Sequence, residues 1–169
     1  MIQLTTKRLR FRQWLPEDAP RLYAHFKDER FTRFIGGAQN PESVWRLLAA
    51  YVGHYQWKGY SYLPVETKEG QLIGSVGLWH SDPWPELELG YWFLPEFQGQ
   101  GYAKEAAQAV WNYALTELEV LTLISLIHHN NKASIRLAEK LGALYEKDIE
   151  LLSFGTHGVW RYLPLMKLD

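Results

Sequence analysis

The chain shows two kinds of hydrophobic pattern, one with the period of a strand and one with the period of a helix. Alternating or β-branched runs predict strands around 9–11 and over 60–65, 72–79, 87–94, 121–127, 143–152 and 159–168. The second and third of these are separated by a short polar turn and are expected to form a hairpin. A polar loop from Gly155 to Gly158 is expected to join the last two strands.

The first predicted strand carries a run of basic residues. Leu9 and Phe11 alternate with charged side chains, so one face of the strand is expected to be apolar and the other solvated. The solvated face consists of three arginines: Arg8, Arg10 and Arg12. We therefore expect these arginines to lie at a solvent-exposed edge.

Apolar residues at helical spacing predict helices between these strands. Pro16 suits the first turn of one helix, and Asn40 followed by Pro41 is a cap signal for the next. Two later helices are predicted over 103–118 and 132–141. The resulting order is β-α-α-β-β-β-α-β-α-β-β, which is a mixed α/β fold.

The composition is that of a globular chain with one core, and we expect a single domain over residues 1–169. Hydrophobic residues make up 47% of the chain, and 18 Lys+Arg against 19 Asp+Glu give a formal net charge of -1. Disorder is therefore excluded, and no basic surplus indicates a nucleic-acid partner. No window approaches the ~18 apolar residues that cross a bilayer, so we expect no membrane partner and a cytoplasmic protein. The absence of cysteine excludes disulfides and thiolate metal sites, and no metal site is indicated.

The segment from Gln98 to Ala103 lies between a predicted strand and a predicted helix. Backbone N–H groups at a helix N-terminus are unpaired and carry partial positive charge, so they form a ready anion site. Gly99 and Gly101 allow the backbone to approach a phosphate. A strand-to-helix turn can also need such glycines for its shape alone. The spacing matches neither the dinucleotide fingerprint nor the P-loop.

This segment resembles a known acyl-CoA signature. The pattern Gln98-x-x-Gly101-x-Ala103 is similar to the Q/R-x-x-G-x-G/A motif of the GCN5-related N-acetyltransferases (GNAT). Three flanking sequence segments also resemble those of this family: Glu88-Leu89-Gly90-Tyr91-Trp92, Asn131-x-x-Ser134 and Glu139-Lys140-Leu141-Gly142. Together they look most like the Rim-type (RimJ/RimL-like) branch, which acetylates protein N-termini and includes relatives acting on small amines. The resemblance implies a central, mostly antiparallel sheet with helices on both faces.

The resemblance also implies a binding site for acetyl-CoA as the acyl donor. The pyrophosphate of coenzyme A would lie on the backbone amides of a six-residue loop: Gln98, Gly99, Gln100, Gly101, Tyr102 and Ala103. Phe93 and Leu94 would bind the pantetheine arm, and Asn131 would contact the cofactor. Family structures splay the strand before this loop from the next one, here 121–127, and the arm enters the gap.

Acetyl transfer to an amine needs a group that takes the ammonium proton and a donor for the departing thiolate. Glu88 lies on a predicted central strand, where a carboxylate is costly unless it is paired or hydrated by a cleft. It is our candidate general base, acting through a water, with a salt-bridged or solvent-facing glutamate as the alternative. In many relatives a tyrosine on the last helix serves as the acid, and Ala138 takes that position here. Ser134 is the candidate near the sulfur by the Rim-type resemblance, and ordinary capping of the turn after Asn131 is its alternative.

The expected function is an acetyl-CoA-dependent N-acetyltransferase, with direct transfer because the chain has no cysteine nucleophile. The expected acceptor is the α-amine of a protein or peptide N-terminus. A small amine, such as a polyamine or aminoglycoside, and a non-catalytic acyl-CoA-binding module are the alternatives. A polycation would need clustered carboxylates, for which there are four candidates: Asp82, Glu86, Glu88 and Glu150. The protein is expected to be a monomer or a homodimer.

Overall fold

The computed structural model describes residues 4–151 and 154–163. Its strands are β1 (Leu9–Phe11), β2 (Tyr62–Thr67), β3 (Leu72–Trp79), β4 (Glu88–Phe93), β5 (Leu123–Ile127), β6 (Leu144–Leu151) and β7 (Gly155–Tyr162). Its helices are α1 (Asp18–Phe26), α2 (Glu29–Thr32), α3 (Pro41–Lys58), α4 (Tyr102–Thr116) and α5 (Lys132–Lys140), with a short 3₁₀ turn η1 (Pro95–Phe97). In this part of the chain no helix is long and apolar enough to cross a membrane.

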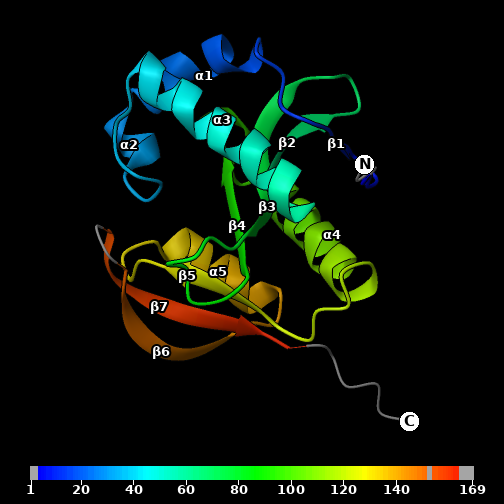
Figure 1. Cartoon of the computed structure of the whole chain (residues 1–169), viewed down its shortest axis with the longest axis vertical. Helices are drawn as coiled ribbons and strands as arrows, with labels where there is room; N and C mark the ends of the chain where they lie inside the picture. The colour runs from blue at the N-terminus through cyan, green and yellow to red at the C-terminus, as the bar shows by residue number, and fades with distance from the viewer. Residues whose placement is uncertain (1–3, 152–153, 164–169) are drawn as a thin grey trace.

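The described strands form one 7-stranded sheet in the order β1-β2-β3-β4-β5-β7-β6. Neighbouring strands are antiparallel except at β4 and β5, which run parallel. Figure 1 shows β4 as the strand between an upper part, with β1–β3 and α1–α3, and a lower part, with β5–β7 and α5. The expected mixed α/β fold with a mostly antiparallel sheet is confirmed.

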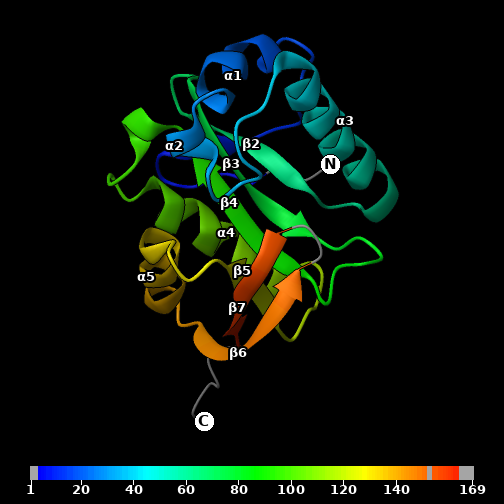
Figure 2. The ribbon, with the colours of Figure 1, turned by 90° about the vertical axis from the view of Figure 1, so that its left-hand side faces the viewer.

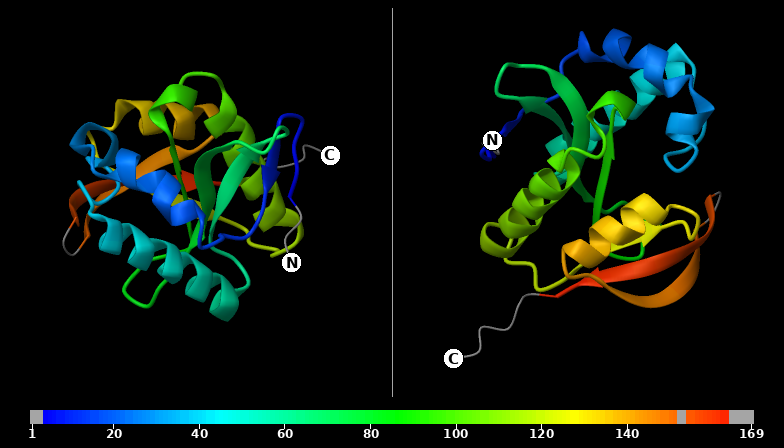
Figure 3. Two further views of the ribbon diagram at one scale, coloured as in Figure 1. Left: turned by 90° about the horizontal axis from the view of Figure 1, so that it is seen from above. Right: turned by 180° about the vertical axis from the view of Figure 1, so that it is seen from behind.

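Helices cover both faces of the sheet, as Figure 3 shows from above and from behind. Because side chains of a strand alternate between its faces, successive residues of β4 enter different cores. Leu89 and Phe93 belong to the core under α4, whereas Trp92 packs with residues of α1 and α3. Glu88, which lies an even number of positions from Trp92, therefore faces the α1–α3 side.

Several predicted elements match the structure, and three differ from it. The strand 72–79 and the helix starts at Pro41 and Lys132 are as expected. The loop expected at 155–158 is wrong, because these residues form the first half of β7 and pair with β5 and β6. The short helix α2 was not expected, and β2 begins and ends two residues later than 60–65. Residues 152 and 164–168, included in the last two predicted strands, lie outside the described residues.

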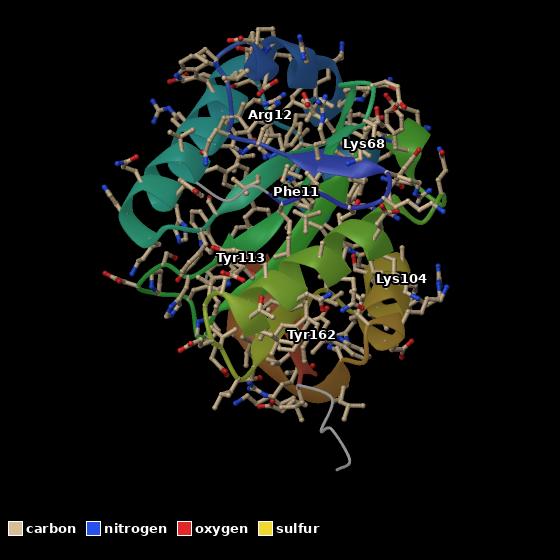
Figure 4. The ribbon with its side chains drawn as sticks, turned by 90° about the vertical axis from the view of Figure 1, so that its right-hand side faces the viewer. Phe11, Arg12, Lys68, Lys104, Tyr113 and Tyr162 are labelled. Carbon is tan, nitrogen blue, oxygen red and sulfur yellow. The ribbon has the colours of Figure 1, made fainter. Side chains whose placement is uncertain are left out.

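The expectation of a solvated basic edge holds for Arg10, which is exposed on the edge strand β1, but not for Arg12, which is ion-paired with a buried carboxylate. Arg12 donates to both carboxylate oxygens of Asp18, at 2.6 and 2.8 Å, and its Nε donates to Glu66 Oε1 at 2.8 Å. Asp18 is fully buried at the start of α1. Arg12 lies where β1 meets α1, as Figure 4 shows. The arginine therefore joins the sheet edge to the first helix by neutralising a buried charge.

Replacing Arg12 by leucine is expected to destabilise the fold, because the buried Asp18 carboxylate would lose both short hydrogen bonds from Arg12 and keep, among the described residues, only Arg21, at 3.9 Å, as a cation. Breaking a buried ion pair from one side costs about 3–5 kcal/mol. Urea unfolding at neutral pH measures this loss. Arg10→Leu is the matched control on the same strand, since Arg10 is about half exposed and lies 3.7 Å from Glu66. Its loss should stay below about 1 kcal/mol; equal losses in the two variants would contradict the role given to Arg12.

Candidate active site

Glu88 is the first residue of β4 and lies where β4 and β5 come together. In the described part of the chain these two strands are in register at the single pair Glu88–Ile124. Next to it, the Ile124 amide donates to the Leu87 carbonyl at 3.1 Å. One residue further, the link to β4 is made by a side chain, since Ser125 Oγ donates to the Leu89 carbonyl at 2.5 Å. Main-chain pairing of the two strands therefore ends close to Glu88.

Beyond that point β4 keeps its pairing with β3 but not with β5. The Leu94 amide donates to the Ile73 carbonyl at 2.9 Å, so the main-chain groups of Leu94 point toward β3. Because direction alternates along an antiparallel strand, those of Tyr91 and Phe93 point toward the β5 side. The Phe93 carbonyl already accepts a hydrogen bond from Gln98 Nε2 at 2.8 Å. Of the two residues predicted for the pantetheine arm, Phe93 thus faces the gap and Leu94 directs its amide away from it.

The carboxylate of Glu88 is buried and held by two N–H donors. The side chain is 8% exposed. The Leu126 amide donates to Oε1 at 3.2 Å, and the Trp84 indole donates to Oε2 at 2.7 Å. Burial raises the pKa of Glu88 to about 7, although the hydrogen bonds from Leu126 and Trp84 lower it. A carboxyl group with this pKa can both accept and release a proton near neutral pH.

Gly90 makes room for a tyrosine beside this carboxylate. A Cβ atom at Gly90 would lie 1.7 Å from the hydroxyl oxygen of Tyr62, so only glycine fits here. Tyr51 of α3 stacks on Tyr62 with ring centroids 5.1 Å apart. Burial, with a contribution from the Glu88 charge, raises the pKa of Tyr62 well above its ordinary value. Neutral hydroxyl groups therefore surround Glu88 on the α3 side of the sheet.

The predicted phosphate-binding loop lies directly after β4 and η1. Gly99 and Gly101 have φ values of +75° and +82°, a conformation that side chains with a Cβ rarely adopt. Gly101 is the N-cap of α4, and no side chain caps the first turn of this helix. The loop is shaped from within, since Gln100 Nε2 donates to the Glu96 carbonyl at 2.8 Å. The N–H groups of the first turn are thus left without a side-chain acceptor.

Arg8 and Glu105 fix this loop to β1. Arg8 Nε lies 2.6 Å from Glu105 Oε2, and its Nη1 donates to the Gln100 carbonyl at 3.0 Å. The guanidinium also lies over the Tyr102 ring, 4.4 Å from its centroid. Sequence reasoning missed this contact, because nothing in the local pattern connects residues 97 positions apart.

Asn131 and Ser134 lie at the start of α5. Asn131 is the N-cap, and its Oδ1 accepts from the Ser134 amide at 3.2 Å. The Ser134 carbonyl accepts from the Tyr91 hydroxyl at 3.3 Å, on the opposite face of β4 from Glu88. Glu88 and the start of α5 therefore lie on opposite faces of β4. Ala138 is fully buried in the core.

Aromatic rings and histidines lie near one another in the loops and on β7. The rings of Phe34 and His128 are 5.6 Å apart, and those of His128 and His157 are 5.5 Å apart. The Trp84 ring contacts that of Phe154 at 6.3 Å. Figure 2 shows the segment after α2 facing the β7 side of the molecule, where these loops lie. In residues 4–151 and 154–163, no three His, Asp or Glu side chains are grouped to hold a metal ion.

A groove of about 1090 Å³ lies elsewhere, along α4 and the N-terminal segment. Lys104 and Tyr113 line it, and Figure 4 labels both on α4. Among the predicted site residues, only Gly101 lies in its lining. The groove is therefore distinct from the surroundings of Glu88.

Comparisons with known proteins agree with this architecture. Residues 8–144 match the family model described as acetyltransferase (GNAT) domain. The uncharacterized N-acetyltransferase YoaA of Bacillus subtilis (strain 168) is 30% identical over 145 residues, which are 82% of this chain and 81% of YoaA. The structure of an acetyltransferase from Agrobacterium tumefaciens has a TM-score of 0.87 and 28% identity, covering 96% of this chain and 94% of that one. RimL, a ribosomal L7/L12 alpha-N-protein acetyltransferase solved in complex with coenzyme A, has a TM-score of 0.78 and 17% identity over 100% of both chains, which shows a shared fold.

The mixed sheet, the glycine turn after β4 and these likenesses define an acyl-transferring enzyme of the acetyltransferase class. The chain belongs to the GNAT family of N-acetyltransferases. The family expected from the acyl-CoA signature is confirmed.

Proposed function

We propose that this enzyme transfers an acetyl group from acetyl-CoA to the α-amine of a protein or peptide N-terminus, with Glu88 as the general base. The observation that carries the proposal is the buried Glu88 carboxylate, held by two N–H donors at the point where β4 and β5 part. Its pKa of about 7 suits a group that takes a proton from an ammonium ion near neutral pH.

Three features of the chain fit acetyl-CoA. The first turn of α4 has no side-chain cap, Gly99 and Gly101 have positive φ values, and no atom lies within 4 Å of a Cβ built at Gly99. The amides from Gln98 to Ala103 would therefore hold the pyrophosphate without an excess of basic residues. Phe93 at the end of β4 would align the pantetheine arm, whereas the main-chain groups of Leu94 are already bonded to Ile73 and Phe97. Asn131 at the start of α5 would contact the arm. When bound, acetyl-CoA supplies the acetyl thioester.

Glu88 takes up the first of the two protons that the acceptor nitrogen loses. It takes this proton from the acceptor ammonium through a water, which leaves the amine nitrogen with a free lone pair for attack on the acetyl carbonyl carbon. The Leu126 and Trp84 donors stabilise the charged form of Glu88 before the proton arrives. Ser134, in the first turn of α5, is the proposed hydrogen-bond donor toward the sulfur as the C–S bond breaks, and the second proton that the nitrogen loses passes to this sulfur to give the thiol. Catalysis then needs no acyl-enzyme.

The distribution of charge favours an N-terminal α-amine over a polyamine. Arg161 donates to both oxygens of Glu86 at 2.8 Å, so this carboxylate is already neutralised. Glu150 accepts from the hydroxyl of Thr156, and Glu88 is buried. Two of the four candidates for holding a polycation, Glu86 and Glu88, are therefore not free to do so. RimL, which shares this fold, is an alpha-N-protein acetyltransferase.

The acceptor is tested by thiol release from acetyl-CoA with purified protein and a matched pair of peptides. Both peptides contain an internal lysine, and one has its α-amine already acetylated. We expect turnover with the free peptide, loss of turnover with the blocked one, and at least about tenfold lower kcat/KM for spermidine or an aminoglycoside, because Glu86 and Glu88 are not free to hold a polycation.

Mass spectrometry of the product identifies the acetylated nitrogen. Preferential turnover of spermidine or the aminoglycoside would overturn the acceptor while keeping acetyl transfer. Binding of coenzyme A without turnover of any acceptor would overturn the enzymatic proposal and favour the acyl-CoA-binding module.

A further inference from the structure

Trp84 lies in the loop between β3 and β4, and its side chain contacts Glu88, the first residue of β4. Its indole N–H donates to Glu88 Oε2 at 2.7 Å, the shorter of the two hydrogen bonds to this carboxylate. The other donor, the Leu126 amide, belongs to β5 and cannot be removed by a side-chain substitution. Of the two hydrogen-bond donors to Glu88, only the Trp84 indole can therefore be removed by a substitution.

The two hydrogen bonds have a common geometric effect. A carboxylate has about four lone-pair sites, and the donors from Leu126 and Trp84 occupy one on each oxygen. The plane of the Glu88 carboxylate is thereby fixed, while further lone pairs stay available for a proton. Without the indole, the carboxylate would keep one donor and could rotate about its last bond.

A second contact of the indole is with an aromatic ring. The Trp84 ring meets the Phe154 ring edge-on, with centroids 6.3 Å apart and planes at 78°. Phe154 precedes β7 and is about half exposed. Phe154 offers packing but no hydrogen bond, so its replacement tests the effect of ring packing separately from that of the indole N–H.

We propose that Trp84 is a positioning residue, whose indole N–H orients the Glu88 carboxylate for proton transfer and stabilises its charged form. The inference rests on the proposed function of Glu88. In this role Trp84 acts through Glu88 and does not touch the reacting atoms.

The other ionisable groups near Glu88 determine whether a titration near pH 7 can be assigned to Glu88. The charge of Glu88 acts on four wholly or partly buried tyrosines from α3, β2, β4 and β7: Tyr51, Tyr62, Tyr91 and Tyr162. Burial raises the pKa of each, that of Tyr162 to about 12, so all four stay neutral between pH 5 and 9. Glu86, at the entrance to β4, is paired with Arg161. Titration of Glu88 is therefore expected to dominate near pH 7.

The kinetic test compares the pH dependence of kcat/KM in wild type and Trp84→Phe, which keeps an aromatic ring but loses the donor. Loss of a hydrogen bond to the charged form should move the acidic limb upward by about one pH unit. At pH 6 the variant should be about tenfold slower than wild type, and near pH 9 the two should converge. Trp84→His, whose imidazole keeps an N–H, should recover part of the shift. Phe154→Ala is the packing control and should leave the midpoint in place.

A spectroscopic test needs no turnover. In ¹⁵N-labelled protein, the indole signal that disappears in Trp84→Phe belongs to Trp84, and we expect it to titrate near pH 7 in wild type. The titration should vanish in Glu88→Gln, which separates Glu88 from nearby histidines such as His128. An indole signal that does not titrate, or that titrates equally in Glu88→Gln, would overturn the proposal.

The two tests also separate this inference from the proposed function. If the indole titrates with Glu88 but Glu88→Gln turns over normally, the hydrogen bond stands and the general base is wrong, and with it the positioning role. If Glu88→Gln is inactive but Trp84→Phe has the wild-type midpoint, Glu88 stands and Trp84 is merely structural. An equal shift in Phe154→Ala would assign the effect to loop packing, against the proposal.

Discussion

Replacing Gly101 by aspartate is expected to abolish the binding of coenzyme A while the protein remains folded. Gly101 is the N-cap of α4, a position where aspartate is ordinarily favourable, although its φ of +82° costs a side chain about 1 kcal/mol. The new carboxylate would lie beside the uncapped amides that we assign to the pyrophosphate. Charge repulsion at about 4 Å amounts to about 1–4 kcal/mol for each pair of charges. Isothermal titration calorimetry should therefore show at least about a hundredfold weaker binding.

Gly101→Asn is the matched control, since asparagine has the size of aspartate and tolerates a positive φ better than most side chains. A Cβ at this position lies 3.4 Å from Arg8 Nη2, and both variants share this contact. The difference in affinity between them therefore isolates the charge. Equal affinities for Gly101→Asp and wild type would show that the phosphates bind elsewhere.

The loop after β4 was predictable because its determinants are local. Gln98, Gly99 and Gly101 lie within four positions, and a strand before them and a helix after them are visible in the hydrophobic pattern. The positive φ of both glycines follows from the same short segment. The same hydrophobic pattern placed Glu88 on a strand but left open whether its carboxylate is buried or faces solvent.

The partners of these residues were not predictable, because they come from distant or irregular segments. Arg8 lies on a strand whose alternation indicated solvent, yet its guanidinium meets Glu105 and the Gln100 carbonyl. Trp84 belongs to an irregular loop, where no periodicity fixes the direction of a side chain. The contact that orients Glu88 therefore depends on the assembled sheet.

The error at Gly155–Gly158 has a related cause. Gly155 and Gly158 read as loop residues by propensity, but the structure pairs Gly158 with Ile127 on one side and with Asp148 on the other. Two neighbouring strands supply the hydrogen bonds that propensity alone disfavours. The helix α2, over Glu29–Thr32, is too short to give a periodic signal.

Replacing Glu88 by glutamine is expected to lower kcat by about 10²–10⁴-fold, because glutamine cannot take the ammonium proton. The wild-type enzyme should show an acidic limb with a midpoint near pH 7, set by the Glu88 pKa, and the variant should lack it. Affinity for coenzyme A should stay near the wild-type value, since the loop from Gln98 to Ala103 is untouched. Steady-state thiol release across pH 5–9 measures the first two effects.

The pH dependence of the free energy of unfolding reports the pKa of Glu88 independently of activity. Burial raises the pKa of Glu88 from 4.5 to about 7, so the folded protein binds a proton that the unfolded chain has lost. The resulting contribution to stability is complete below about pH 4.5 and is lost as the pH rises through 7. At one pKa unit per 1.36 kcal/mol, the loss is about 3 kcal/mol by pH 8. Glu88→Gln does not titrate, so its stability relative to wild type should increase over this range.

Glu86→Gln is the matched control, because Glu86 lies two residues away and is bound by Arg161 at the entrance to β4. Its pKa is lowered by that arginine, so its removal should leave the limb near pH 7 in place and kcat within a few-fold. If Glu88→Gln keeps the limb and the rate while the relative stability follows pH as expected, Glu88 titrates as described but is not the base. The proton acceptor would then have to be sought among the histidines near β5 and β7, of which His128 and His157 lie together.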